Sequence, residues 1–325
     1  MKRFKHILCV VTYGKQDQLA LERAVSLAEN NNAKLTVAGV TPLVTTDIEI
    51  VDGGPVSTDL QEALVSAKQQ ELENLAQPYR ERLAIQTKVL VGISFLEIIR
   101  EVLRQDHDLV IKMPDTADWL DRVFGSDDMH LLRKCPCPVW LIKSETAKPY
   151  RCILAAVDVN NEGPPDERDA KMELNRQILE MAISQALSEF AELHIVHAWE
   201  AVGESTMRGA FLHTPDEKII AYVEQVRQQQ ATRFDSLIHT VTNSMGQDAV
   251  NYLKPKTHLV KGQARRAIPA LAKQISCDLV VMGTVARTGI PGFIMGNTAE
   301  TILNQIDCSV LAIKPPGFQT PVTIE

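Results

Sequence analysis

Four glycines near the carboxyl end of the chain lie in a stretch that could bind an anion: Gly283, Gly289, Gly292 and Gly296. Because glycine has no side chain, backbone amides in such a loop can approach the oxygens of a phosphate group. Asn297 follows the last glycine and, with a glutamate three residues later, resembles a capping box that opens a helix. The positive end of the helix dipole favours an anion there. The alternative is that these glycines only form turns.

Two apolar stretches must position this loop. Leu279 to Met282 is a continuous apolar run between polar residues, which predicts a strand buried on both faces of a parallel sheet. Ser309 to Lys314 predicts a second strand, which Pro315 and Pro316 end because proline cannot donate to a sheet ladder. The glycines therefore connect a buried strand to a helix.

The spacing of these residues resembles that of the universal stress proteins. Nucleotide-binding members of this family carry Gly, two residues, Gly, nine residues, Gly and then Ser or Thr. Gly283 and Gly296 match this pattern, whereas Ala286 stands at the second glycine and Asn297 at the hydroxyl residue. A methyl group at Ala286 crowds the backbone against a phosphate, and Asn297 offers an amide instead of a hydroxyl. The resemblance implies ATP or AMP as the cofactor, with Mg²⁺ accompanying the nucleotide.

The same order of segments occurs twice along the chain. His6 to Thr12 is echoed by Cys152 to Asp158, and Leu35 to Val40 is echoed by Leu193 to Ala198. Two later pairs of apolar runs repeat in the same order, 108–111 with 278–281 and 137–143 with 308–314. We therefore predict two copies of one fold, as domains 1–147 and 148–325.

Strands that alternate with helices predict an α/β fold, here two tandem doubly wound domains that each hold a five-stranded parallel sheet. The resemblance, which extends over both halves and is strongest to the tandem E-type members of the family, supplies the strand order 3-2-1-4-5. It implies a Rossmann-like fold similar to the adenine nucleotide alpha hydrolases. The fifth strands, 139–143 and 309–314, are apolar edges that should not stay open, so we expect them to pair antiparallel with each other within one chain.

The resemblance also implies a set of binding residues in the second half. An aspartate that ends the first strand contacts adenosine in nucleotide-binding relatives, and Asp158 stands there. The residues of the expected site are Ala156, Asp158, Ala198, Met282, Gly283, Ala286, Arg287, Gly296, Asn297 and Thr298. The alternatives are that Asp158 is a turn residue, that Ala198 and Met282 belong to the core, and that Arg287 is a solvated loop residue.

The two halves differ most at this loop. Thr12 replaces the aspartate in the first half, and only Gly125 and Ser126 match at the helix start. From Met113 through Asp128 there are five aspartates and one arginine, a local charge of -4, whereas Gly283 to Thr298 carries one arginine, a local charge of +1. Each close like charge costs about 1 kcal/mol even in water, so we expect nucleotide in the second half alone.

Composition narrows the class of protein. The 325 residues carry a net charge of -7, which gives no support to nucleic acid as a partner. No apolar run approaches membrane-spanning length, so we expect a cytoplasmic protein without a membrane partner. The six cysteines lie beside apolar strands and are expected to be reduced and structural. No metal-ligating cluster or nucleophile elbow is present in the sequence, so any ATP hydrolysis would be slow.

Together these patterns predict a cytoplasmic stress-response protein whose second half binds an adenine nucleotide. The alternative is a scaffold, or a protein that binds another small molecule, in which the nucleotide site has decayed. The expected partners are the nucleotide and a second copy of the chain in a homodimer.

Overall fold

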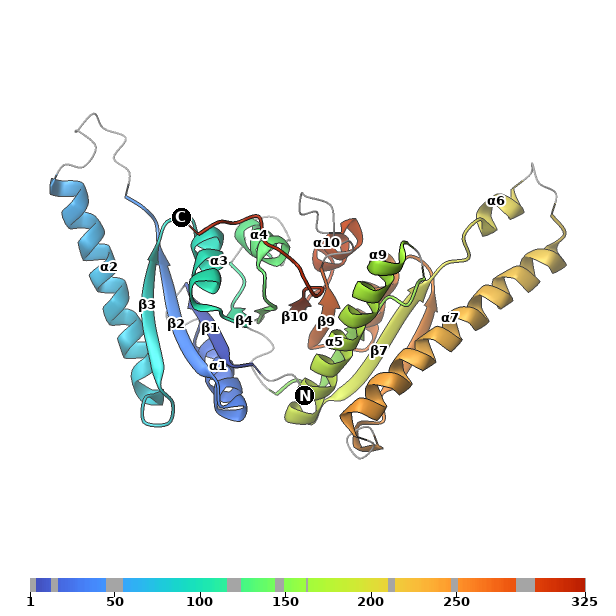
Figure 1. The fold of residues 1–325 in the computed structure, drawn as a ribbon, viewed down its shortest axis with the longest axis horizontal. Coiled ribbons are helices and arrows are strands. Elements are labelled where there is room, and N and C mark those ends of the chain that lie inside the picture. Colours follow the sequence, from blue (N-terminus) through green and yellow to red (C-terminus); the bar gives the residue numbers. More distant parts are fainter. Residues whose placement is uncertain are drawn as a thin grey trace.

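The computed structural model describes residues 4–12, 17–44, 55–115, 124–143, 149–161, 163–209, 214–246, 251–284 and 296–324. These residues form one ten-stranded sheet with the order β3-β2-β1-β4-β5-β10-β9-β6-β7-β8 (Figure 1). The first half provides β1 (His6–Val11), β2 (Lys34–Thr41), β3 (Ile85–Val91), β4 (Leu109–Lys112) and β5 (Val139–Leu141). The second half provides β6 (Cys152–Ala156), β7 (Glu192–Trp199), β8 (Lys256–Lys261), β9 (Leu279–Gly283) and β10 (Ser309–Ile313).

Helices cover both faces of the sheet, and a hydrophobic core lies on each face. On one face are α1 (Gln18–Asn31), α2 (Pro55–Ala76), α5 (Pro165–Glu189) and α7 (Asp216–Met245). On the other face are α3 (Ser94–Gln105), α4 (Ser126–Lys134), α9 (Ala264–Gln274) and α10 (Asn297–Leu303). A short helix α6 (Glu204–Arg208) follows β7, and a 3-10 turn η2 (Gln77–Tyr79) follows α2.

Within each half, all neighbouring strands are parallel. The predicted order 3-2-1-4-5 is therefore confirmed in both halves, as β3-β2-β1-β4-β5 and β8-β7-β6-β9-β10. At the centre of the sheet, β5 and β10 pair antiparallel, with Trp140 opposite Leu311. Both side chains are fully buried, so the fifth strands cover each other's edges.

The apolar runs of the sequence become the inner strands. All five residues of β6 and of β10 are buried, and β10 ends at Ile313, ahead of the two prolines. The outermost strand β8 has the sequence KTHLVK and only exposed or half-buried residues. An edge strand needs little apolar surface, which is why the sequence pattern did not reveal β8.

The two halves repeat even their backbone turns. Gly92 after β3 and Gly262 after β8 have φ values of +137° and +138°, which only glycine adopts readily. Asn32 after α1 and Phe190 after α5 both adopt the left-handed conformation that ends a helix. The second half thus places a phenylalanine where the first has an asparagine, a residue that tolerates this conformation better.

The expected capping box at Asn297 is not present. Helix α10 begins at Asn297 itself, its N-cap is Gly296, and no side chain caps it. Glu300 instead forms an ion pair with Arg133 of α4, with 2.5 Å between Nη2 and Oε1. The attraction of an arginine in the other half draws the glutamate away from its own helix start.

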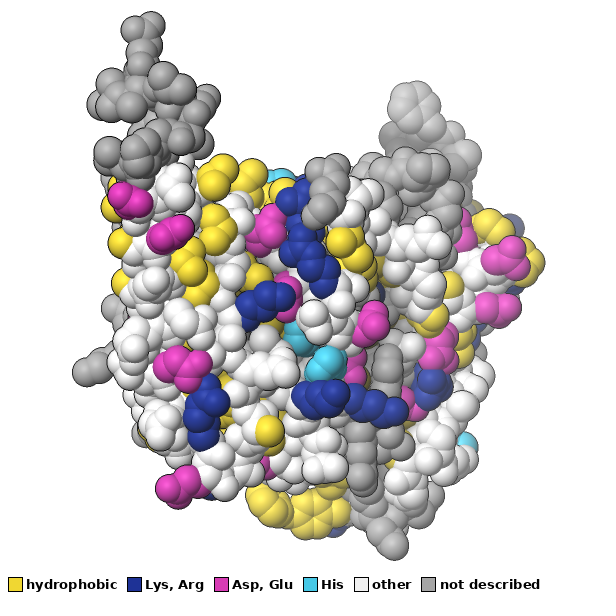
Figure 2. All heavy atoms as spheres, turned by 60° about the vertical axis from the view of Figure 1, so that its left-hand side comes forward, with side chains coloured by type: hydrophobic (Ala, Val, Ile, Leu, Met, Phe, Trp, Pro, Cys, Tyr) yellow, Lys and Arg dark blue, Asp and Glu magenta, His cyan; other side chains and the backbone are white. Residues whose placement is uncertain are grey.

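The cysteines and the charged surface residues are arranged as follows. All six cysteines are free thiols and buried. Among the described residues, no helix is both long and apolar enough to cross a membrane. On the face formed by the first half, Lys and Arg side chains lie in small groups with Asp and Glu between them (Figure 2).

Candidate functional site

A cavity of about 720 Å³ opens at the carboxyl ends of β6, β7 and β9. The strand order reverses there, because β7 follows β6 on one side while β9 flanks it on the other. Eight of the predicted site residues line this cavity: Ala156, Asp158, Ala198, Met282, Gly283, Gly296, Asn297 and Thr298. Ala286 and Arg287 lie outside the described residues.

Asp158 lies on the turn that follows β6. Its carboxylate is half exposed, at 52%, and forms an ion pair with Lys171 of α5, with Nζ and Oδ2 3.1 Å apart. The other carboxylate oxygen accepts a hydrogen bond from the backbone amide of Asn160 at 3.0 Å. Asp158 thus stabilises the turn, as the alternative interpretation proposed, and its side chain also lines the cavity.

The backbone conformation of Gly283 does not by itself require a glycine. Its φ does not lie in the positive region, so no left-handed conformation demands glycine here. A Cβ at this position would lie 2.8 Å from Cδ2 of Leu174 on α5, which is closer than real Cβ atoms approach. A side chain at Gly283 would therefore require the Leu174 side chain to move.

The wall of the cavity is mixed in character. Apolar side chains come from helices on both faces of the sheet: Leu174, Ile178, Ile268 and Ile302. Charged side chains of both signs surround them: Asp158, Glu167, Lys171, Glu200 and Arg265. Apolar walls with a few charged groups suit a small molecule that has an apolar part and a polar or charged part.

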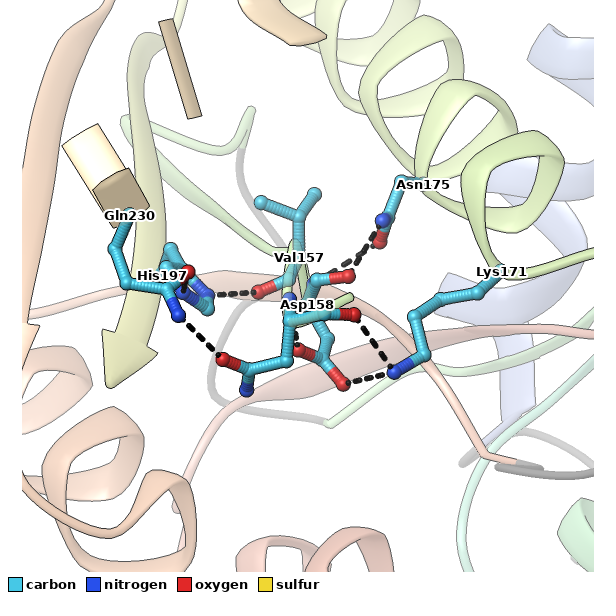
Figure 3. Close-up of polar contacts among 7 residues, drawn as sticks. Val157, Asp158, Lys171, Asn175, His197 and Gln230 are labelled. Atoms are coloured by element: carbon cyan, nitrogen blue, oxygen red, sulfur yellow. Dashed lines mark hydrogen bonds and ion pairs between the residues drawn. The ribbon is translucent and has the colours of Figure 1, made fainter. Parts of the chain in front are cut away.

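Polar residues from α5, β7 and α7 hold the Asp158 turn, and sequence reasoning did not find them (Figure 3). Asn175 of α5 donates to the carbonyl oxygen of Asp158 at 2.7 Å and accepts from its amide at 3.0 Å. His197 of β7 contacts the carbonyl oxygen of Val157 and the side chain of Gln230 on α7. A polar residue at a buried helix position, such as Asn175 beside Leu174, was the available signal.

The corresponding place in the first half is filled by a buried ion pair. Lys112, at the end of β4, aligns with Met282, and Asp128 in α4 aligns with Ala299. The Lys112 Nζ lies 2.6 Å from Asp128 Oδ1 and 2.9 Å from Asp115 Oδ1, and the Lys112 and Asp128 side chains are at most 1% exposed. The second Asp128 oxygen accepts from the amides of Asp115 and Gly125.

This pair corrects the simple charge count of that loop. Burial acts against the ammonium group of Lys112, but the carboxylates of Asp128 and Asp115 outweigh it and raise the pKa of the lysine. Two of the five aspartates are thus matched by a lysine that the loop count omitted. The local repulsion is smaller than expected, and instead Asp128 takes the amides at the start of α4.

The end of β1 is filled as well. Thr12 donates its amide to Asp17 at 2.6 Å, and its carbonyl oxygen accepts from Lys68 of α2 at 3.2 Å. The Lys68 stem crosses Gly39, where a Cβ would lie 2.6 Å from the lysine Cε. His197 occupies the position of Gly39 in the second half, so a histidine takes the space that a lysine stem fills in the first.

Both halves of the chain match the same family of known proteins. Residues 3–143 and 150–314 each match the model of the universal stress protein family. The chain belongs to this family. It is 30% identical to universal stress protein E of Escherichia coli (strain K12) over 331 aligned positions, which cover 100% of this chain and 98% of that protein. The universal stress protein E homolog of Haemophilus influenzae is 28% identical and covers 96% of this chain and 98% of its own.

A solved structure repeats the tandem arrangement. The crystal structure of a putative universal stress protein from Pseudomonas aeruginosa UCBPP-PA14 superimposes with a TM-score of 0.64 at 28% identity, over 96% of this chain and 94% of that chain. The chain is thus a tandem universal stress protein, from a family that serves the stress response.

Proposed function

We propose that the second half binds an adenine nucleotide, ATP or AMP, in the cavity at the ends of β6, β7 and β9. The observation that carries this proposal is that eight residues chosen from the family pattern, which are scattered from 156 to 298, line one cavity. That cavity lies where strand order reverses, the place at which open α/β sheets bind ligands.

Each group has a role in this proposal. Ala156, Ala198 and Met282 form an apolar slot for adenine, and Asp158 accepts from the ribose hydroxyls. Gly283, Ala286, Arg287, Gly296, Asn297 and Thr298 surround the phosphates, whose charge would bring Mg²⁺ with it. We further propose residues 1–147 and 148–325 as the two domains, and the cytoplasm as the location of the protein.

A second candidate is a small molecule other than a nucleotide. The ion pair between Asp158 and Lys171 favours it, because ribose recognition requires this carboxylate to exchange the lysine for hydroxyl groups. The apolar side chains from α5, α9 and α10 would then provide most of the contact.

The decisive experiment replaces a small residue of the proposed adenine site by a large one. Ala198→Phe should abolish saturable ATP and AMP binding in calorimetric titrations, since an aromatic ring would occupy part of the cavity that Ala198 lines. Its matched control is Val40→Phe, at the equivalent position of β2 in the first half, which should leave the affinity unchanged. Chromatography of ligand released by denaturing the purified protein identifies what the cavity holds. Retention of a molecule without an adenine ring, together with no titration heat from ATP or AMP, would support the second candidate.

A further inference from the structure

A buried histidine lies beneath the turn that carries Asp158. His197 is fully buried on β7. Its Nδ1 lies 3.3 Å from the carbonyl oxygen of Val157, and its Nε2 lies 3.3 Å from Oε1 of Gln230 (Figure 3). Gln230, itself 8% exposed, donates through Nε2 to Oδ1 of Asn160 at 3.0 Å. Three side chains thus form a chain from the imidazole to the turn.

The turn is the polar wall of the cavity. Asp158 and Asn160 both line the cavity, and the Asp158 carboxylate holds the Asn160 amide. Lys171 donates to the carbonyl oxygen of Asn160 at 3.2 Å. Any change in the orientation of the Asn160 side chain therefore changes the group that the turn presents to a ligand.

The direction of this hydrogen-bond chain depends on the proton count of His197. A carbonyl oxygen can only accept, so Nδ1 must carry a proton in order to donate to Val157. In the neutral ring, Nε2 is then an acceptor, so Gln230 must donate to it and accept from the Asn160 amide. This leaves the Asn160 oxygen for the cavity. In the imidazolium ring, Nε2 donates to Gln230, whose amide donates to the Asn160 oxygen, which leaves the Asn160 NH₂ group for the cavity. The two amides have this second orientation in the structure, where Gln230 Nε2 donates to Asn160 Oδ1.

We propose that His197 is a positioning residue for the nucleoside. In the neutral form it orients Gln230 and Asn160 so that the turn offers two acceptors, the Asp158 carboxylate and the Asn160 oxygen, to the ribose hydroxyls. Protonation reverses both amides, replaces one acceptor by a donor, and weakens binding. The inference rests on the proposed function, since it assumes a ligand with hydroxyl donors at this wall.

The surroundings of His197 favour the neutral form near neutral pH. Burial lowers the pKa of the imidazole and Lys171 acts in the same direction, while Asp158 raises it, as do the contacts with Val157 and Gln230. Within the part of the chain that the structure describes, the other elements packed against the ring bring neutral side chains, Gln230 and Phe234 from α7 and Leu259 from β8. On this inference, deprotonation of His197 turns both amides from the recorded orientation to the acceptor arrangement, which is lost again as the pH falls through the lowered pKa.

Adenosine is the probe for the test, because it lacks the phosphate that would itself titrate. For the unaltered protein, the dissociation constant should rise by about 3- to 10-fold between roughly pH 8 and pH 5, the effect of one hydrogen bond. Gln230→Leu should weaken adenosine binding at high pH and remove most of this pH dependence. Thr242→Val is the matched control, because it removes a buried hydroxyl from the same helix about 18 Å away along its axis and should keep the pH dependence.

A readout without ligand separates this inference from the proposed function. In NMR titrations, the side-chain amide signals of Asn160 and Gln230 should shift with the same midpoint as the His197 ring, and in Gln230→Leu the Asn160 signal should no longer follow the ring. Failure of adenosine to bind at any pH, with the amides still following the ring, would overturn the proposed function and the nucleoside role together while keeping the proton relay. Amide signals that ignore the His197 titration, or an unchanged pH dependence of binding in Gln230→Leu, would overturn the inference.

Discussion

The two half-sheets have the same strand arrangement but differ in the side chains at their carboxyl edges. In the second half, Met282 and Ala299 border a cavity of about 720 Å³. At the same positions the first half has Lys112 and Asp128, which fill the space with a buried ion pair. The strands, the crossovers and the glycine turns are shared. The replacement of Met282 and Ala299 by an ion pair is thus one clear difference between the two edges.

The first half satisfies backbone amides at this edge with one of its own side chains. Asp128 accepts hydrogen bonds from the amides of Asp115 and Gly125, beside the start of α4. An internal carboxylate thus takes amides that a bound anion would otherwise use. Lys112 then supplies the positive charge that the buried carboxylate requires.

The largest expected effect comes from removing half of this ion pair. Lys112→Met, which copies Met282, should lower the free energy of unfolding by about 3–5 kcal/mol, because Asp128 would stay buried without a counter-charge. Urea denaturation followed by circular dichroism measures this loss. The double variant Lys112→Met with Asp128→Ala, which reproduces the second half, should recover most of the stability. A loss below about 1 kcal/mol in the single variant would mean that the pair is not needed.

A second contrast concerns the lysines that follow the fifth strands. Lys143 forms an exposed ion pair with Asp307, whereas Lys314 is buried and donates to the carbonyl oxygens of Leu132 and Arg133 at the end of α4. Burial lowers the pKa of Lys314 to about 8. The folded state therefore holds this proton less tightly than the unfolded state, and the contribution of the lysine to stability improves as pH rises above 8.

This sign can be tested against a variant without the titrating group. The stability of the unaltered protein relative to Lys314→Met should increase by about 2 kcal/mol between pH 8 and pH 10, as measured by urea denaturation. A flat difference for Lys314 would refute the lowered pKa.

Asp158 and Thr12 offer a smaller contrast at the ends of the first strands. Asp158→Ala should weaken nucleotide binding by about 1 kcal/mol in calorimetric titrations, less than a buried charged hydrogen bond contributes, because half of this side chain is in solvent. Thr12→Ala should leave the affinity unchanged. Equal losses from both variants would place binding in both halves.

The smallest expected effect is at the helix ends. Phe190 is 79% exposed and left-handed, and Asn32 holds the equivalent position. Phe190→Asn should raise stability by about 0.5 kcal/mol, because asparagine tolerates this conformation better and little apolar contact is lost. The reciprocal Asn32→Phe should lower thermal stability. A loss in Phe190→Asn would show that the exposed ring makes a contact worth more than the backbone strain.

The sequence predicts the sheet well because burial on both faces leaves a strong apolar signal. The strand order is confirmed in both halves, and residues at the ends of β6, β7 and β9 gather as expected, since parallel strands end at one edge. The pattern did not predict the polar strand β8, because a strand at the edge of the sheet does not need a continuous apolar run.

The contacts that hold the site were harder to predict. Asn175 and Gln230 lie on long helices whose facing side chains are set by how α5 and α7 pack on the sheet. Lys112 ends an apolar run and looked like a strand boundary, although its replacement by Met282 in the other copy was a visible sign. A charge count along one loop cannot include a neutralising lysine that comes from the preceding strand.

The twist of the sheet gives the tandem a front and a back. Its ten strands make nine neighbouring steps, and at about 20–25° per step these add up to roughly half a turn. Although β5 and β10 run in opposite directions at the centre, β2 and β7 end on the same upper side of the molecule, and α4 and α10 meet there too (Figure 1). A flat sheet would have put the two edges on opposite sides. Insertions in the loops after these strands therefore remodel one side of the molecule and leave the other unchanged.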